Sequence, residues 1–209
     1  MMRILVVDDH AIVRHGFRQA AGDSYDSLVV GEANSADEAL AVARRDRWDV
    51  VVMDINLPGR SGLDVLRDLR REHPRLPVVV YSMHTEEQYA VRAFRAGASA
   101  YVSKASPVEE LFRAIRKVAA GGRHVSPWLA ERLAQDLAGD RPRSVDVLSE
   151  REHEVLRLIA SGRTTTDVAA DLKVSVKTVS TYRARALEKL GLHSTADLVR
   201  YALERRLVP

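Results

Sequence analysis

The sequence predicts two domains, an open, doubly wound α/β domain over residues 1–120 and an all-α domain over residues 148–209, with a linker over 121–147 between them. In the first 120 residues, five short β-branched apolar runs alternate with segments of helical period. These runs are apolar throughout rather than alternating, as a parallel sheet covered on both faces requires. From Leu148 onward the pattern is helical only. With 209 residues, 46% of them hydrophobic, the chain is long enough to bury two cores.

The first domain repeats a strand-then-helix unit five times. The expected strands are residues 4–7, 28–30, 50–53, 78–81 and 100–102. Two of the helices between them show a clear apolar face, formed by Ala36, Ala39, Leu40 and Ala43 in one and by Leu63, Leu66 and Leu69 in the other. Such βα units predict a five-stranded parallel sheet with helices on both faces.

The segment from Gly121 to Val147 interrupts this rhythm. It contains a Gly-Gly pair, Pro127, Pro142 and the polar stretch GDRPRS. The apolar stretch LAERLAQDLA predicts one short helix within it. We therefore expect a linker that contains a helix.

The last domain predicts four helices with recognisable ends. Ser149 with Glu152 and Thr164 with Asp167 have the spacing of capping boxes, and Ser175 is a helix cap before VKTVSTYRARALEKL. Two of these helices are separated by only a short turn, which is the spacing of a helix-turn-helix motif.

Polar side chains follow the strands of the first domain where each strand ends. Asp8 and Asp9 follow the first strand, Asp54 the third, Ser82 ends the fourth, and Lys104 follows the fifth. Ligands of doubly wound sheets bind outside these carboxyl ends, so we expect the side chains to converge. Taken singly, the acids could be helix or turn caps and Lys104 a solvated loop lysine; their joint placement favours a site.

The chemistry of this set favours a magnesium ion and phosphoryl transfer. Three neighbouring carboxylates raise one another's pKa unless a cation is present, and Mg²⁺ prefers hard oxygen ligands. Asp54 can then act as a nucleophile that becomes an acyl phosphate. Lys104 supplies a positive charge for the phosphoryl group, and Ser82 a hydroxyl that can donate to one of its oxygens.

The helix expected over residues 176–190 carries most of the positive charge of the last domain. From Lys173 to Lys189 there are five basic residues and one acid, and the last 62 residues account for all of the net charge of +3. Small and polar side chains flanked by cations are what a helix needs to enter the major groove of DNA. An ordinary solvated helix face has a similar composition, so charge alone leaves both interpretations open.

Composition excludes several other classes of protein. The chain has no cysteine, which rules out disulfides and thiolate metal sites. The apolar run at residues 4–7 is far too short for a signal-peptide core or a membrane span. We therefore expect a cytoplasmic protein with no membrane association.

The motifs VVDDH, VVMDINLPGRSGLDVL, VVYSM and AFRAGASAYVSK resemble the receiver domain of two-component response regulators across residues 1–120. This resemblance implies a flavodoxin-like fold with strand order 2-1-3-4-5 and a sensor histidine kinase that phosphorylates Asp54. It implies Mg²⁺ bound by Asp9, Asp54 and the main-chain carbonyl of Asn56, with Asp8 acting through water. It also implies that Ser82 and Tyr101 form a coupled switch in which the hydroxyl moves toward the phosphate and the ring turns inward. The family often has a cis-proline after the lysine, where this chain has Ala105.

Residues 148–208 resemble LuxR-type helix-turn-helix domains, through LSEREHEVLRLIASG, DVAADLKVSVKTVSTYRARALEKLGL and ADLVRYAL. With the receiver, the resemblance is to the NarL/FixJ subfamily. It implies double-stranded DNA as a partner, homodimers when the chain is phosphorylated or DNA-bound, and RNA polymerase as a further partner. The expected DNA-binding residues are Lys177, Thr178, Ser180, Thr181, Tyr182, Arg183, Ala184 and Arg185. Leu198, Tyr201 and Ala202 are expected to form an apolar strip that pairs DNA-bound domains, and Asp167 departs from the longer glutamate common in the subfamily.

The resemblance therefore predicts a transcription regulator, not an enzyme beyond promoting its own Mg²⁺-dependent phosphorylation and dephosphorylation. A Mg²⁺-dependent phosphohydrolase is the first alternative, but such enzymes of the haloacid-dehalogenase type carry a D-x-D element at the first strand, where this chain has Asp8-Asp9-His10. A second alternative is a DNA-binding regulator that is never phosphorylated. A nucleotide-binding domain is least favoured because no Gly-rich loop follows the first strand.

Overall fold

The computed structural model describes residues 1–24, 27–137, 148–205 and 207–208, and the chain forms two compact units, Met1–Ala138 and Gly139–Pro209.

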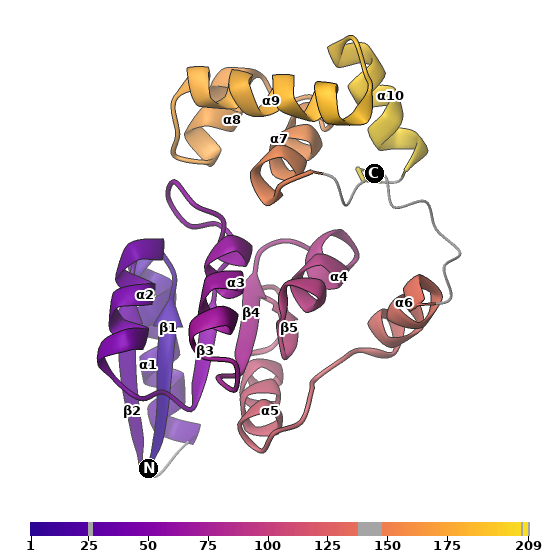
Figure 1. The fold of residues 1–209 in the computed structure, drawn as a ribbon. Coiled ribbons are helices and arrows are strands. Elements are labelled where there is room, and N and C mark those ends of the chain that lie inside the picture. Colours follow the sequence, from indigo (N-terminus) through magenta and orange to yellow (C-terminus); the bar gives the residue numbers. More distant parts are fainter. Residues whose placement is uncertain (25–26, 138–147, 206, 209) are drawn as a thin grey trace. The chain divides into compact units, whose positions relative to one another are not determined.

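The first unit is built on a five-stranded parallel sheet (Figure 1). Its strands are β1 (Met2–Val7), β2 (Leu28–Ala33), β3 (Val50–Met53), β4 (Val78–Ser82) and β5 (Ala100–Ser103), in the order β2-β1-β3-β4-β5. This order confirms the predicted flavodoxin-like topology. In the register, Val7 lies beside Met53 and Tyr81 beside Val102, so the carboxyl ends of these strands meet at one edge of the sheet.

Five helices cover the two faces of the sheet, which has a separate core on each (Figure 1). They are α1 (Ala11–Ser24), α2 (Ala36–Arg45), α3 (Gly62–Glu72), α4 (Glu86–Ala96) and α5 (Val108–Ala119). Alternate residues of each strand point to opposite faces. Leu5 and Val7 therefore pack in the core beneath α2, α3 and α4, and Ile4 and Val6 in the core beneath α1 and α5. This explains why the strand sequences are apolar throughout.

The helix expected in the linker is present as α6 (Pro127–Leu137). It belongs to the first compact unit, and Leu129, which is 0% exposed, lies in the same core as the residues of α2, α3 and α4. The stretch GDRPRS of the predicted linker lies outside the described residues.

The second unit contains the four predicted helices, α7 (Glu150–Ala160), α8 (Thr165–Asp171), α9 (Val176–Leu190) and α10 (Thr195–Glu204). The predicted capping boxes are both present. The Ser149 hydroxyl accepts from the Glu152 N–H and the Thr164 hydroxyl from the Asp167 N–H, while each acid accepts in return. Asp167 therefore caps α8 despite its shorter side chain. Ser175 caps α9 as expected.

The expected apolar strip on α10 is wrong for two of its three residues. Leu198 and Ala202 are both 0% exposed in the core of the second unit, together with Val155 and Val179. Tyr201 is half-buried, and its ring lies 5.5 Å from the Arg205 guanidinium. The apolar period of α10 marks the face that packs within the domain, because a small four-helix unit needs that face for its own core.

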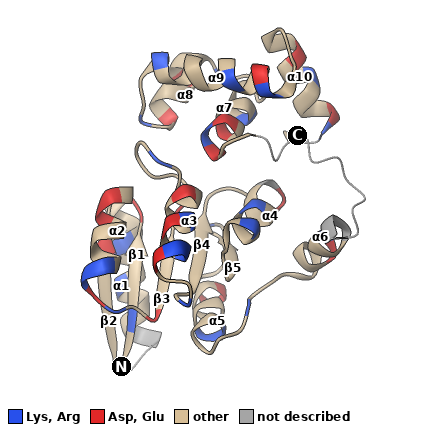
Figure 2. Cartoon of the chain, in the orientation of Figure 1, with Lys and Arg blue, Asp and Glu red and all other residues tan. Residues whose placement is uncertain are grey.

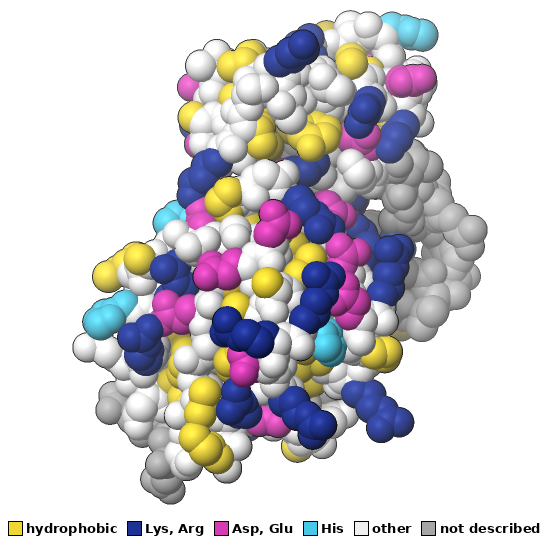
Figure 3. Space-filling view, turned by 60° about the vertical axis from the view of Figure 1, so that its left-hand side comes forward, with side chains coloured by type: hydrophobic (Ala, Val, Ile, Leu, Met, Phe, Trp, Pro, Cys, Tyr) yellow, Lys and Arg dark blue, Asp and Glu magenta, His cyan; other side chains and the backbone are white. Residues whose placement is uncertain are grey.

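Charged residues lie mostly on the helices, while most of the length of the strands is free of them (Figure 2). On the visible face of the first unit, basic and acidic side chains are interspersed (Figure 3). Among the described residues, no helix is long and apolar enough to cross a bilayer.

Candidate functional site

Two strands place buried acids side by side at the carboxyl edge of the sheet. Asp8 follows β1 and Asp54 follows β3, and the Asp54 N–H donates to the carbonyl of Val7 (2.9 Å). The two residues are only 2% and 4% exposed. Burying two carboxylates together is costly unless a cation neutralises them, so this edge requires a positive partner.

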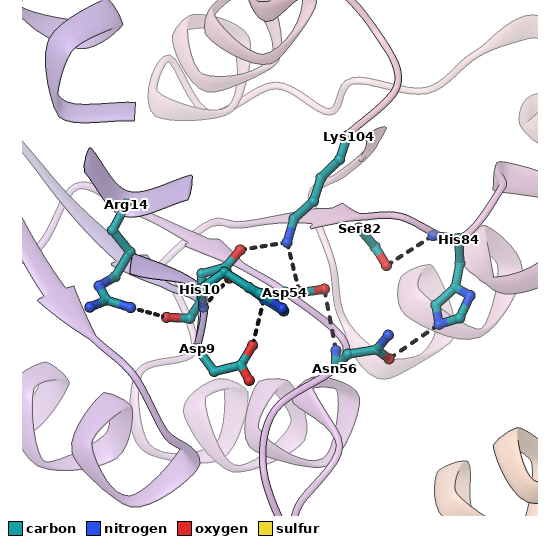
Figure 4. A network of polar contacts seen from close by, with 9 residues as sticks. Asp9, His10, Arg14, Asp54, Asn56, Ser82, His84 and Lys104 are labelled. Atoms are coloured by element: carbon teal, nitrogen blue, oxygen red, sulfur yellow. Dashed lines mark hydrogen bonds and ion pairs between the residues drawn. The ribbon is translucent and has the colours of Figure 1, made fainter. Parts of the chain in front are cut away.

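Lys104 is one such partner (Figure 4). Its ammonium group lies 2.5 Å from Asp8 Oδ2 and 2.7 Å from Asp54 Oδ2, and its side chain is 7% exposed. The Lys104 N–H donates to the carbonyl of Ser82 (2.8 Å), which ties the β5–α5 loop to the end of β4. The peptide bond to Ala105 is trans, as are all others among the described residues. Lysine therefore reaches the acids without the cis-proline common in the family.

Burial and charge act in opposite directions on this pair. Burial raises the pKa of Asp54, the Lys104 ammonium lowers it, and the neighbouring Asp8 carboxylate raises it again, so that the pKa of Asp54 lies above its ordinary value. Burial lowers the pKa of Lys104, but the charges and hydrogen bonds of Asp54 and Asp8 together outweigh it and leave the pKa of Lys104 raised. Lys104 is thus firmly protonated, while Asp54 is not fully compensated by one lysine.

A cluster of possible metal ligands, three carboxylates and one histidine, lies at the same edge. One ligand atom each from Asp8, Asp9, His10 and Asp54 lies within 4.8 Å of the others. The Nδ1 atom of His10 is 2.8 Å from Asp9 Oδ1, and the His10 N–H donates to Asp8 Oδ1 (2.8 Å). The three carboxylates of this cluster are a hard donor set suited to a small divalent cation. The residues present therefore fit a metal ion that could supply the missing positive charge.

The β3–α3 loop is shaped closely around Asp54. The Asn56 N–H donates to Asp54 Oδ1 (3.2 Å), and the Gly62 N–H donates to the carbonyl of Ile55 (2.7 Å). A Cβ atom at Gly62 would lie 2.0 Å from the carbonyl oxygen of Asp54. Only glycine fits here, because the start of α3 packs directly on the backbone of the acid.

The expected switch residues lie beside this loop. Ser82 is 0% exposed, and its hydroxyl accepts from the His84 N–H (3.3 Å). The Tyr101 ring is 5% exposed and points inward, and its hydroxyl donates to the carbonyls of His84 (2.9 Å) and Thr85 (3.3 Å). The Tyr101 side chain is therefore almost completely buried.

Sequence reasoning missed three residues of this network. His84 Nε2 lies 3.1 Å from the side-chain oxygen of Asn56, so it joins the β3–α3 and β4–α4 loops (Figure 4). Arg14 donates to the carbonyl of Asp8 (2.7 Å), and His10 contacts both acids. The positions of His10, directly after the acid pair, and of His84, two residues after Ser82, could have indicated that both lie near the site. The position of Arg14 in the sequence gives no such indication, because its contact with Asp8 depends on the course of α1.

The outer face of α9 presents the residues predicted for DNA binding. Lys177, Thr181, Ala184 and Arg185 are exposed, and Thr178, Ser180 and Arg183 are partly exposed. Tyr182 packs against the core of the unit, which favours a supporting role over a direct contact. The opposite face is core-facing as predicted, with Val179 and Ala186 both 0% exposed.

Family models match both units of the chain. Residues 4–116 match the response regulator receiver domain, and residues 146–202 match bacterial regulatory proteins of the luxR family. The chain belongs to the two-component response regulators with a luxR-family output domain. The expectations of receiver domain, helix-turn-helix domain and NarL/FixJ-type regulator are therefore confirmed.

Several response regulators are similar over their whole length. Response regulator GacA of Pseudomonas aeruginosa is 39% identical over 212 residues, covering 100% of this chain and 98% of that protein. Response regulator UvrY of Escherichia coli K12 is 33% identical, covering 99% and 96%.

Solved structures of response regulators agree with this assignment. A LuxR-family response regulator from Aurantimonas sp. SI85-9A1 matches with a TM-score of 0.59 and 40% identity, covering 65% of this chain and 97% of that one. RcsB from Salmonella enterica serovar Typhimurium, solved on the promoter P1flhDC with phosphomimetic BeF3-, matches with a TM-score of 0.59 and 26% identity, covering 96% and 97%.

Proposed function

We propose that Asp54 accepts a phosphoryl group from a sensor histidine kinase and that this controls DNA binding by α9. The observation that carries the proposal is the buried Asp54 carboxylate at the carboxyl edge of the sheet. Asp54 and Asp8 both contact the Lys104 ammonium, and both belong to the acidic cluster. Burying these charged groups lowers the stability of the fold, and phosphoryl transfer is a reaction that needs a carboxylate nucleophile beside a cation.

In this proposal a carboxylate oxygen of Asp54 attacks the phosphorus of a phosphohistidine. The phosphorus–nitrogen bond breaks, the imidazole leaves with its electron pair, and Asp54 becomes an acyl phosphate. Lys104 is close enough to Asp54 to bind an oxygen of the incoming group, and the Ser82 hydroxyl can turn from its contact with His84 to donate to another. The Asn56 N–H keeps the attacking carboxylate oriented.

The metal of the acidic cluster is proposed to be Mg²⁺. Asp9, Asp54 and the main-chain carbonyl of Asn56 would bind it, with Asp8 acting through water. When bound it would neutralise negative charge shared by the carboxylates and the phosphoryl oxygens. No further catalytic activity is proposed beyond formation and loss of the chain's own acyl phosphate.

The output is proposed to be sequence-specific binding of double-stranded DNA. We assign Ser180, Thr181 and Ala184 to contacts with bases, and assign to phosphate contacts or to support of the helix Lys177, Thr178, Tyr182, Arg183 and Arg185. Single domains of this size bind weakly, so paired half-sites and a homodimer are expected. RNA polymerase is the further partner that a regulator bound at a promoter would meet.

The test compares the parent chain with Asp54→Asn in DNA affinity. Binding-site selection on random DNA first supplies the operator, and affinity is then measured with a small phosphodonor and Mg²⁺ present or absent. We expect the phosphodonor to tighten binding by the parent about tenfold or more and to leave Asp54→Asn unchanged, since allosteric coupling of about 1–3 kcal/mol is typical. Equal affinities under all conditions would favour a regulator that is never phosphorylated.

A further inference from the structure

Residues 122–137 follow α5, pass along the outer side of the edge strand β5 and include α6. This segment is named the strap. The His124 N–H donates to the carbonyl of Ser99 (3.0 Å), and His124 forms a parallel bridge with Ala100. β5 is the edge strand on this side, so the strap adds a short pairing segment to it. Main-chain pairing therefore fixes the position of the strap along β5.

Two polar contacts fix the strap to the neighbouring helices. The Ser126 hydroxyl donates to Glu86 Oε1 (2.8 Å) in the first turn of α4 and accepts from the Leu129 N–H (3.0 Å) in the first turn of α6. His124 Nε2 lies 2.7 Å from Glu110 Oε1 in the first turn of α5. One serine therefore caps α6 and joins its start to the start of α4.

The apolar side of α6 completes the core beneath α4. Leu129 is 0% exposed and lies in the same cluster as Tyr89, Phe94 and Tyr101. Val125, Trp128 and Leu133 pack against this cluster as well. Burying one leucine and part of a tryptophan stabilises the docked strap and offsets the entropy lost when this segment is ordered.

The start of α4 is thus held from two sides. The Tyr101 hydroxyl donates to the carbonyl of Thr85, the residue that precedes α4. The next residue, Glu86, accepts from Ser126 of the strap. The inward tyrosine and the docked strap therefore contact adjacent residues at the start of α4 and belong to one apolar cluster.

We propose that the strap is an intramolecular ligand of the α4–β5 face that holds Tyr101 inward and thereby favours the phosphorylated state of the receiver. This inference rests on the proposed function, in which the inward ring accompanies phosphorylation of Asp54. With the strap docked, an outward ring leaves a void in the cluster that contains Leu129, so docking disfavours that state. A segment that binds one of two states more tightly shifts the equilibrium toward it.

Linkage then requires the effect to be reciprocal. If the strap favours phosphorylation, a phosphoryl mimic at Asp54 must favour strap docking by the same factor.

The test measures the affinity of the full chain for beryllofluoride with Mg²⁺, by fluorine NMR, in the parent and four variants. Leu129→Ala removes the buried anchor, Leu129→Met retains its volume, and Glu131→Ala changes an exposed residue of the same helix. We expect affinity about five- to tenfold weaker for Leu129→Ala, as for typical allosteric couplings, and within about twofold of the parent for the other two. Thermal unfolding of each variant checks that the receiver remains folded; Ser126→Ala, which removes the polar anchor alone, should weaken affinity in the same direction.

Hydrogen exchange provides the reciprocal readout. Beryllofluoride should slow amide exchange in α6 of the parent and have no such effect in Asp54→Asn. If the fluorine signal shows beryllofluoride bound while Leu129→Ala keeps parental affinity or α6 exchange is unchanged or faster, the strap proposal is wrong and the proposed function stands. If no adduct forms on the folded parent, the proposed function itself fails.

Discussion

The carboxyl edge of the receiver sheet and the outer face of α9 both gather charge, but in opposite surroundings. At the sheet edge, Asp8, Asp54 and Lys104 have side chains only 3–7% exposed and compensate one another at hydrogen-bond distance. On α9, Lys177 and Arg185 are exposed to solvent. A buried charge depends on each of its neighbours, whereas an exposed charge acts almost independently. Substitutions at the first site should therefore be severe and coupled, and those at the second mild and additive.

The largest effect expected from this contrast is that of Lys104→Met. Removing the Lys104 ammonium leaves Asp8 and Asp54 buried without this cation, which should lower the free energy of unfolding by about 3–5 kcal/mol. Lys177→Met is the matched control and should change it by less than about 0.5 kcal/mol. Chemical denaturation without divalent ions measures both free energies of unfolding. Equal losses in the two variants would contradict the distinction between buried and exposed charges.

A smaller loss is expected when the loop around Asp54 is forced to move. In Gly62→Ala the new methyl group collides with the Asp54 carbonyl, so we expect a loss of about 1–3 kcal/mol and weaker metal binding. Gly16→Ala, on a helix with nothing within 4 Å of the added carbon, should be neutral or slightly stabilising. A neutral Gly62→Ala would show that the loop is more adaptable than its packing implies.

On α9 the expected signature is in the salt dependence rather than in stability. Arg185→Ala should lower the slope of log affinity for DNA against log salt by about one unit, as the loss of a phosphate contact does. Asp54→Asn, with the DNA-binding face intact, should keep the parental slope. An unchanged slope for Arg185→Ala would remove this residue from the DNA contacts.

The smallest expected effect has the opposite sign. Because burial and Asp8 raise the pKa of Asp54, its ionised form destabilises the native receiver at neutral pH when no metal is present. The stability due to the protonated form is complete below the pKa of the unfolded state and is lost as pH rises through the higher native pKa. Asp54→Asn should therefore be more stable than the parent at neutral pH, and the difference should vanish in acid. A gain that does not depend on pH would point to a cause other than ionisation.

The sheet and the acid–lysine set could be predicted from the sequence because one rule governs both. Parallel strands end at one edge, so Asp8, Asp54, Ser82 and Lys104 had to lie near one another once the strands were recognised. The apolar faces of the helices could be predicted as well, because residues that share a face recur with the 3.6-residue period of a helix.

What the sequence could not provide depends on long-range packing. The contact of His84 with Asn56 follows from the conformations of two loops, and the docking of α6 from a match between Leu129 and a distant cluster. The apolar face of α10 was recognised but given the wrong partner. Periodicity shows that a face is covered without showing what covers it, and Leu198 and Ala202 serve the core of their own domain.

The most direct test of the central claim is to locate the phosphoryl group. The parent chain is incubated with a small phosphodonor and Mg²⁺ and digested, and its peptides are mapped by mass spectrometry. Asp54 should carry one phosphoryl group in the parent, and Asp54→Asn should carry none. Equal labelling of both chains, or a phosphoryl group confined to another residue of the parent, would contradict the assignment of Asp54.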